Sequence, residues 1–129
     1  MGSYNQREKE WKNMINDLFS QMETIVHDCD LENRGYICKS LKDNTTSVTL
    51  AIAYDSKYYR SYSYQITYSH DISCGKINIM TLNKYGNIID NKVYSHSISL
   101  EDMKAEMNAS VPTRSLKDFV DFVIRDAEN

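Results

Sequence analysis

Residues 54–68, YDSKYYRSYSYQITY, hold six of the ten tyrosines in this 129-residue chain. From Tyr58 to Tyr68 the larger side chains occupy even positions, whereas Ser, Gln and Thr occupy odd positions, with Tyr59 as the exception. Strict alternation of aromatic and β-branched residues with polar ones is typical of a strand that is buried on one side. Because successive side chains of a strand point to opposite faces, we predict that the tyrosines share one face and the hydroxyls the other.

A second alternating run lies immediately before this strand, with apolar side chains at Val48, Leu50, Ile52 and Tyr54. The polar segment 55–57 separates the two runs. It contains Asp and Ser, which are common in turns because their side chains bond to nearby backbone groups. Two alternating runs joined by so few polar residues predict a β-hairpin.

Three more strands are expected. One precedes this hairpin, at residues 36–41, and two follow it, at residues 76–82 and 88–98. Segments rich in turn-forming residues separate them, at 43–46, 69–75 and 83–87. In the last of these, Gly86 or Asn87 can adopt the positive φ that tight hairpins need. Apolar residues of the final strand fall on both faces, which predicts a bulge or an edge position.

Helical patterns flank the strands. Residues 4–28 repeat apolar side chains with the spacing of one helix face: Trp11, Met14, Ile15, Leu18, Phe19, Met22, Ile25 and Val26. Two C-terminal helices are expected at 100–109 and 115–127, the second capped by Ser115. The predicted fold class is α+β: a single domain, 1–129, with an antiparallel meander of about five strands over 36–98. The long N-terminal helix and the C-terminal helices should flank it and pack on one face.

Composition and cysteine usage limit the cellular setting. No apolar run approaches the roughly 20 residues that a membrane helix needs, and no secretory leader is visible. Three cysteines are too few for a disulfide framework, so a cytoplasmic protein with free thiols is expected. His27, Cys29 and Cys38 lack the paired spacing of a metal site, and no glycine-rich phosphate loop occurs, so no metal and no cofactor are expected.

Charge is divided along the chain. Residues 1–32 carry seven acids and three bases, residues 33–99 carry four acids and eight bases, and residues 100–129 carry seven acids and four bases. The expected helices are therefore acidic and the expected sheet is basic. The formal net charge of -3 argues against binding to duplex DNA, which needs a concentrated basic surface.

The tyrosine row has two interpretations. We favour a row that faces inward beneath the helices, because tyrosines make a better core than the opposite Ser, Gln and Thr. The alternative is a basic, stacking surface for a nucleotide or another small anionic ligand. The binding residues of that surface would be Lys57, Tyr58, Tyr59, Arg60, Tyr62, Tyr64, Lys76, Lys84 and Tyr85.

No catalytic motif is evident, so the main hypothesis is a small non-catalytic protein that inhibits or sequesters a protein partner. Tyrosine is enriched at such interfaces. A composition rich in Asn, Lys, Ile and Tyr is common in phages and mobile elements. It favours an anti-defence inhibitor in a host–virus interaction, or an immunity-type protein, with a secretion-chaperone-like role as a sibling hypothesis.

Two further hypotheses concern an enzyme and self-association. A metal-free nuclease could use Arg60, His70 and His96 with a tyrosine, if the fold brought these residues together. A sheet with one open face and unpaired edges also makes a homodimer plausible.

Overall fold

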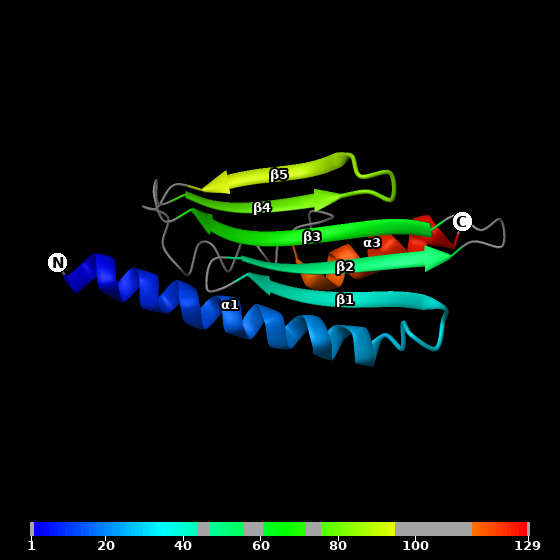
Figure 1. The fold of residues 1–129 in the computed structure, drawn as a ribbon, viewed down its shortest axis with the longest axis horizontal. Coiled ribbons are helices and arrows are strands. Elements are labelled where there is room, and N and C mark those ends of the chain that lie inside the picture. Colours follow the sequence, from blue (N-terminus) through cyan, green and yellow to red (C-terminus); the bar gives the residue numbers. More distant parts are fainter. Residues whose placement is uncertain (1, 44–46, 56–60, 72–75, 95–114, 129) are drawn as a thin grey trace.

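The sheet is an antiparallel meander in which five strands pair in chain order (Figure 1). The strands are β1 (Tyr36–Asp43), β2 (Ser47–Asp55), β3 (Ser61–Asp71), β4 (Lys76–Leu82) and β5 (Ile88–Tyr94). The computed structural model of the chain describes residues 2–43, 47–55, 61–71, 76–94 and 115–128. The predicted α+β class and meander order are confirmed, and the element bounds differ from the expected ones mainly in β1 and β3.

Strand β3 is longer than expected at its C-terminal end. Ser69, His70 and Asp71 pair with Asn78, Ile77 and Lys76 of β4. The prediction of a loop beginning at residue 69 was therefore wrong for these three positions. The alternation of β3 continues through them, and a ladder with β4 satisfies their backbone groups better than an early turn would. Strand β1 likewise continues to Asp43, which pairs with Ser47.

The β4–β5 connection is the predicted tight hairpin turn. Its Asn83 side chain accepts hydrogen bonds from the backbone N–H groups of Tyr85, at 2.9 Å, and Asn87, at 3.0 Å. Gly86 has φ +81°, a left-handed conformation that glycine adopts without steric cost. A register shift next to Leu82 gives the predicted bulge and places an extra β5 residue opposite β4.

Two helices form where helical periodicity was found, α1 (Gly2–Asp28) and α3 (Leu116–Ala127). Ser115 is the N-cap of α3, and its Oγ accepts a 3.1 Å hydrogen bond from the backbone N–H of Asp118. The helix expected at 100–109 and the end of the last strand, 95–98, lie outside the described residues.

Both helices cover the same face of the sheet (Figure 1). Their apolar stripes and the even positions of β2 and β3 form one core, in which Tyr64 and Tyr68 are fully buried. The prediction that the tyrosine row faces inward is confirmed for these two residues. The other core members are Trp11, Met14, Ile15, Leu18, Met22, Leu31, Tyr36, Val48, Leu50, Ile52, Ile66, Ile79, Leu116, Phe119, Val120 and Val123.

Candidate functional site

Three of the sequence-predicted binding residues meet at the end of the sheet where α3 ends. Tyr64 Oη donates a 2.7 Å hydrogen bond to Oδ2 of Asp126, and Lys84 Nζ lies 3.9 Å from the same oxygen. The Lys84 ammonium also lies 5.3 Å from the ring centroid of Tyr85, close enough for a cation–π interaction. Because Tyr64 is buried and bonded to α3, its role in this arrangement is structural rather than that of an exposed contact residue.

The other predicted binding residues either lie apart from this group or fall outside the described residues. Tyr85 is 69% exposed and forms an isolated bridge with Ser63 of β3. Tyr62 pairs through its backbone with Tyr54. Lys76 begins β4 at the opposite end of the sheet from Tyr85. Four members, Lys57, Tyr58, Tyr59 and Arg60, lie outside the described residues, so the predicted site is only partly placed.

A second polar contact joins the connection between α1 and β1 to Glu128, the C-cap residue of α3. Nη2 of Arg34 lies 3.0 Å from each of the two carboxylate oxygens of Glu128. Nearby, the rings of Tyr36 and Tyr54 pack with their centroids 4.8 Å apart. Burial, with a smaller contribution from the negative charge of Glu128, raises the pKa of Tyr36 to about 12. A tyrosine with a raised pKa keeps its proton at neutral pH and is not poised to act as a base.

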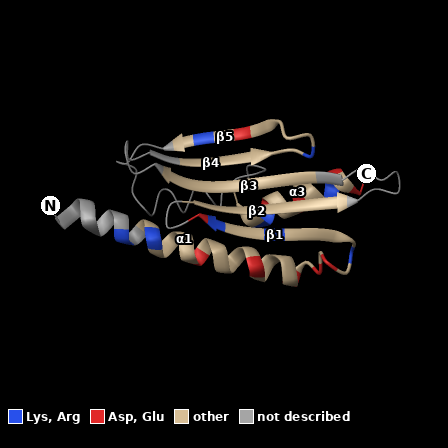
Figure 2. Cartoon of the chain, viewed as in Figure 1, with Lys and Arg blue, Asp and Glu red and all other residues tan. Residues whose placement is uncertain are grey.

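The opposite charges of the helices and the sheet contact one another. Figure 2 marks the charged positions along the ribbon, with acidic positions on both helices and basic positions on β1, on β5 and in the β4–β5 turn. Arg34 contacts Glu128 and Lys84 contacts Asp126, while Lys42 Nζ donates a 3.0 Å hydrogen bond to Oδ1 of Asn16 on α1. Two basic side chains of residues 33–99, Arg34 and Lys84, are thus paired with carboxylates near the C-terminal end of α3, which leaves less of the basic charge for an anionic ligand.

The opposite face of the sheet carries no helix among the described elements. Strand register places its residues in rows that run across the sheet. The three complete rows are Lys39–Ala51–Gln65–Leu82–Ile88, Leu41–Thr49–Thr67–Met80–Asn91 and Asp43–Ser47–Ser69–Asn78–Val93. We call this surface the helix-free face. At its centre the hydroxyls of Thr49 and Thr67 are hydrogen-bonded at 2.8 Å.

Exposed large hydrophobic side chains occur at the margins of the sheet, and several of them belong to the helix-free face. The described ones are Ile37, Leu41, Tyr85, Ile88, Ile89 and Val93, all on the edge strands or the β4–β5 turn. Ile37 and Ile88, at opposite margins, are 61% and 58% exposed. Scattered exposed hydrophobic residues are ordinary, but a set found on the sheet and its β4–β5 turn, and lacking among the described side chains of the two helices, indicates an interaction surface.

Sequence reasoning did not single out these margin residues. In β1 the inward positions are occupied by Tyr36, Cys38 and Ser40, whereas the outward ones include Ile37 and Leu41. Ile and Leu in alternation with Cys and Ser would ordinarily be assigned to the core. The available signal was Tyr36, whose large ring pairs with Tyr54 and thereby sets the facing of the strand.

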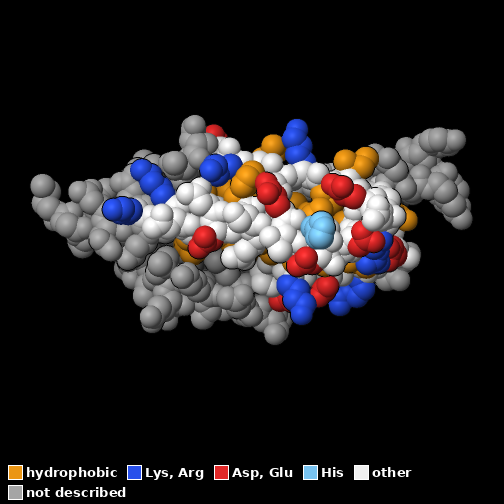
Figure 3. Space-filling view, turned by 90° about the horizontal axis from the view of Figure 1, so that it is seen from below, with side chains coloured by type: hydrophobic (Ala, Val, Ile, Leu, Met, Phe, Trp, Pro, Cys, Tyr) orange, Lys and Arg blue, Asp and Glu red, His pale blue; other side chains and the backbone are white. Residues whose placement is uncertain are grey.

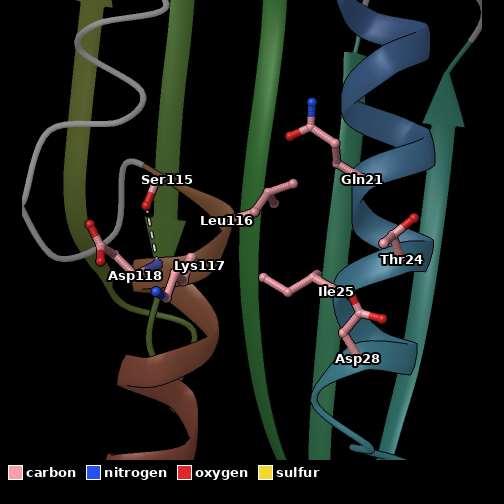
Figure 4. Close-up of a pocket in the computed structure, with 8 residues that line it drawn as sticks. All are labelled: Gln21, Thr24, Ile25, Asp28, Ser115, Leu116, Lys117 and Asp118. Carbon is pink, nitrogen blue, oxygen red and sulfur yellow. Dashed lines mark hydrogen bonds between the residues drawn. The ribbon is translucent and has the colours of Figure 1, made fainter.

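The helix layer contains an open cavity of about 420 Å³ between α1 and the start of α3 (Figure 4). Ile25 and Leu116 point into it from the two helices, and polar side chains surround them. The polar lining residues are Gln21, Thr24, Asp28, Ser115, Lys117 and Asp118. Carboxylates and an ammonium group are both present, so this lining selects no single ligand charge.

The exterior on the α1 side mixes acidic and basic side chains, and its described part has no continuous basic patch (Figure 3). His27 is highly exposed, with Nδ1 3.6 Å from the Asp28 carboxylate. The ring of His70 packs edge-on against Trp11, and His96 lies outside the described residues. No group of three potential metal ligands occurs among the residues that the structure describes.

The described thiols, Cys29 and Cys38, are free and partly buried. Burial is the main cause that raises both pKa values, that of Cys38 to about 11. Neither thiol therefore has the lowered pKa of a nucleophilic cysteine.

Comparison of the chain with protein-family models, curated proteins and solved structures finds no match. In the described parts of the chain, neither helix has the length and apolar character needed to cross a membrane.

Proposed function

We propose that this chain is a non-catalytic binding protein that inhibits or sequesters a partner protein through its helix-free face. The observation that carries the proposal is the confinement of the described large exposed hydrophobic residues to the sheet. Aliphatic side chains at both margins flank a centre of Ala, Ser, Thr and Gln, so the face combines apolar contact area with hydrogen-bonding groups. Such a mixture is typical of non-obligate protein interfaces.

A protein partner is favoured over a nucleotide because the described tyrosine row is not available for stacking. Tyr64 and Tyr68 lie in the core, and Lys84 is engaged by Asp126. The nuclease hypothesis gains no support from the described residues, because the ring of His70 packs on Trp11, and Arg60 and His96 lie outside those residues.

Within the binding class, we propose an anti-defence inhibitor or an immunity-type protein of a phage or mobile element. Small size and a composition rich in Asn, Lys, Ile and Tyr support this role. The proposed location is the cytoplasm, which is supported by the free thiols Cys29 and Cys38.

The test uses affinity purification from host cells followed by native mass spectrometry. Three forms of the full chain are compared: the wild type, the double variant Ile37→Asp/Ile88→Asp, and the control Glu23→Lys on the exposed side of α1. We expect one protein to co-purify at fixed stoichiometry with the wild type and the control. Its recovery should fall at least about tenfold with the double variant, because two buried aspartates would be costly in an apolar interface.

Two outcomes would contradict the proposal. One is a wild-type chain recovered without a stoichiometric protein partner. The other is a partner retained equally by the double variant, which would place the contact elsewhere on the molecule. Circular-dichroism melting of each form shows whether a loss of binding reflects unfolding, and both Ile37 and Ile88 are exposed enough to be replaced without disturbing the core.

A further inference from the structure

We infer that the helix-free face pairs with a second copy of this chain, in a face-to-face dimer whose two-fold axis runs along the row that begins at Leu41. The dimer itself follows from the layout of the face. Its consequence, that a second copy and the partner compete for one surface, rests on the proposed function.

The rows across the sheet define the symmetry. A two-fold axis along the Leu41–Thr49–Thr67–Met80–Asn91 row brings that row opposite itself in the second copy. The row that begins at Lys39 then lies opposite the row that begins at Asp43. Strands of the two sheets remain within the roughly 30° that aligned sheet packing allows. An isologous contact of this kind closes at two copies.

Charge complementarity supports this axis. Lys39 and Asp43 are the charged residues at described side-chain positions of the face, and they stand one row above and one row below Leu41 on β1. The two-fold axis therefore sets Lys39 of each copy opposite Asp43 of the other, which makes two equivalent ion pairs. The alternative two-fold axis, along the strands, would set β1 of one copy over β5 of the other. Lys39 would then face Ile88 and Asp43 would face Val93, so neither charge would have an ionic partner.

Apolar contacts are matched in the same arrangement. Leu41 meets Leu41 and Met80 meets Met80 near the axis, while the Leu82 and Ile88 positions face the row that ends at Val93. The centre, around the bonded hydroxyls of Thr49 and Thr67, brings small polar side chains together and leaves room for bridging water.

The size of the face is sufficient for a weak dimer. Five strands about 4.8 Å apart and about eight residues long cover roughly 600 Å² per copy. The pair would bury roughly 1,200 Å², which is at the lower end of specific interfaces and fits a dissociation constant in the micromolar range.

Pairing through the sheet edges is less favourable. Both edge strands carry charged residues at positions that face the helix layer, Lys42 on β1 and Asp90 and Lys92 on β5. The Lys42 ammonium lies 5.5 Å from the ring centroid of Phe19. Charged residues at such positions are a common protection of edge strands against pairing with another chain. The broad face, rather than an edge, is thus the surface for self-association.

The experiment is sedimentation equilibrium on the purified full chain over a concentration series, so that no partner is needed. We expect a reversible equilibrium between the 15.0 kDa chain and a species of twice that mass. Leu41→Lys, which sets two cations opposite each other at the axis, should leave only the monomer, whereas Glu23→Lys on α1 should not change the dissociation constant.

Charge reversal tests the axis itself. Lys39→Asp and Asp43→Lys should each weaken the dimer roughly tenfold, since each sets like charges opposite one another at two places. The double reversal, Lys39→Asp with Asp43→Lys, should restore dimerisation to within a few-fold of the wild type.

A chain that stays monomeric up to about 100 times the expected micromolar dissociation constant would overturn the dimer. Dimerisation that withstands Leu41→Lys would show that the helix-free face is not the contact surface. A double reversal that dimerises no more tightly than the single reversals would rule out the proposed two-fold axis. These results are separate from the proposed function, because a monomer that still captures its partner contradicts only the dimer. A dimer without a partner contradicts only the proposed function.

Discussion

Tyr64 on β3 and Asp126 on α3 are joined by a 2.7 Å hydrogen bond, although 62 positions separate them in the chain. The Tyr64 ring also packs edge-on against Phe122, with the ring centroids 6.0 Å apart. Two contacts thus attach the C-terminal helix to the central strand. They give the tyrosine-rich segment a structural task, because a buried phenol provides apolar area and one polar group that needs a partner.

Removal of the Tyr64 hydroxyl should weaken this attachment. Tyr64→Phe keeps the ring in the core but deprives the Asp126 carboxylate of its donor. Hydrogen bonds to charged groups contribute about 1.5–3 kcal/mol, so we expect the free energy of unfolding to fall by about that amount. Urea unfolding monitored by circular dichroism measures it. Tyr85→Phe is the matched control, because Tyr85 is exposed and should tolerate the change. Equal stability of the two variants would contradict the assigned role.

Phe119 should be the most sensitive position of α3. It is fully buried in the shared core, and the change of a buried Phe to Ala removes apolar contacts and leaves a cavity. We expect Phe119→Ala to lower the free energy of unfolding by about 3–5 kcal/mol. Ile37→Ala, at an exposed position of β1, should change it by less than about 0.5 kcal/mol. Similar losses in the two variants would mean that α3 does not pack on the sheet as described.

Stability should fall in alkaline solution, in part through Tyr36. Its pKa in the folded chain is raised to about 12 from an ordinary value of 10.0, first by burial and then by the charge of Glu128. Below pH 10 both states keep the proton, so the contribution of Tyr36 is constant. Between pH 10 and about 12 the unfolded chain loses the proton first, so stability decreases as pH rises.

The contribution of Tyr36 can be isolated with Tyr36→Phe. Urea unfolding midpoints measured below pH 10 and near pH 11 should decline less in this variant than in the wild type. The change keeps the ring of Tyr36 in the core, so stability at neutral pH should change little. Parallel declines in both proteins would show that other groups carry the effect.

Cys38 should be slow to react in the folded protein. Burial, with a smaller contribution from Glu32, raises its pKa from 9.0 to about 11. A shift of about two units lowers the thiolate fraction at neutral pH roughly a hundredfold, and the thiolate is the species that alkylating reagents attack. Peptide mapping after timed iodoacetamide treatment should show this protection in the native protein and its loss in urea. Native and denatured rates within a few-fold of each other would refute it.

The amphipathic patterns located the described helices and strands, although they ended β1 and β3 too early. Alternation in 48–54 and 58–68 located the central hairpin, and the stripe from Trp11 to Val26 located α1. Ser115 was identified as the cap of the last helix from its position before an apolar run. These are local properties, because a strand repeats every two residues and a helix every 3.6, and each pattern is complete within its own segment.

The division of charge along the chain is a feature whose role could not be predicted from local patterns. Acidic helices and a basic sheet could be recognised by counting residues, and they suggested an anion-binding surface. In the folded chain Glu128 meets Arg34 and Asp126 meets Lys84, so part of the division is satisfied internally. No count along the chain distinguishes charges that face a ligand from charges that face each other, because the distinction depends on which distant segments are packed together.

By itself, the sequence determined the α+β class, the order of the described elements and the inward facing of Tyr64 and Tyr68, since all of these follow from the spacing of apolar residues. Only the tertiary structure decided that Tyr64 is bonded to Asp126, that Ile37 and Leu41 face away from the helices, and that Lys39 and Asp43 share the helix-free face. The reason is strand register: it is set by pairing between segments, and a shift of one residue exchanges every side chain between the two faces.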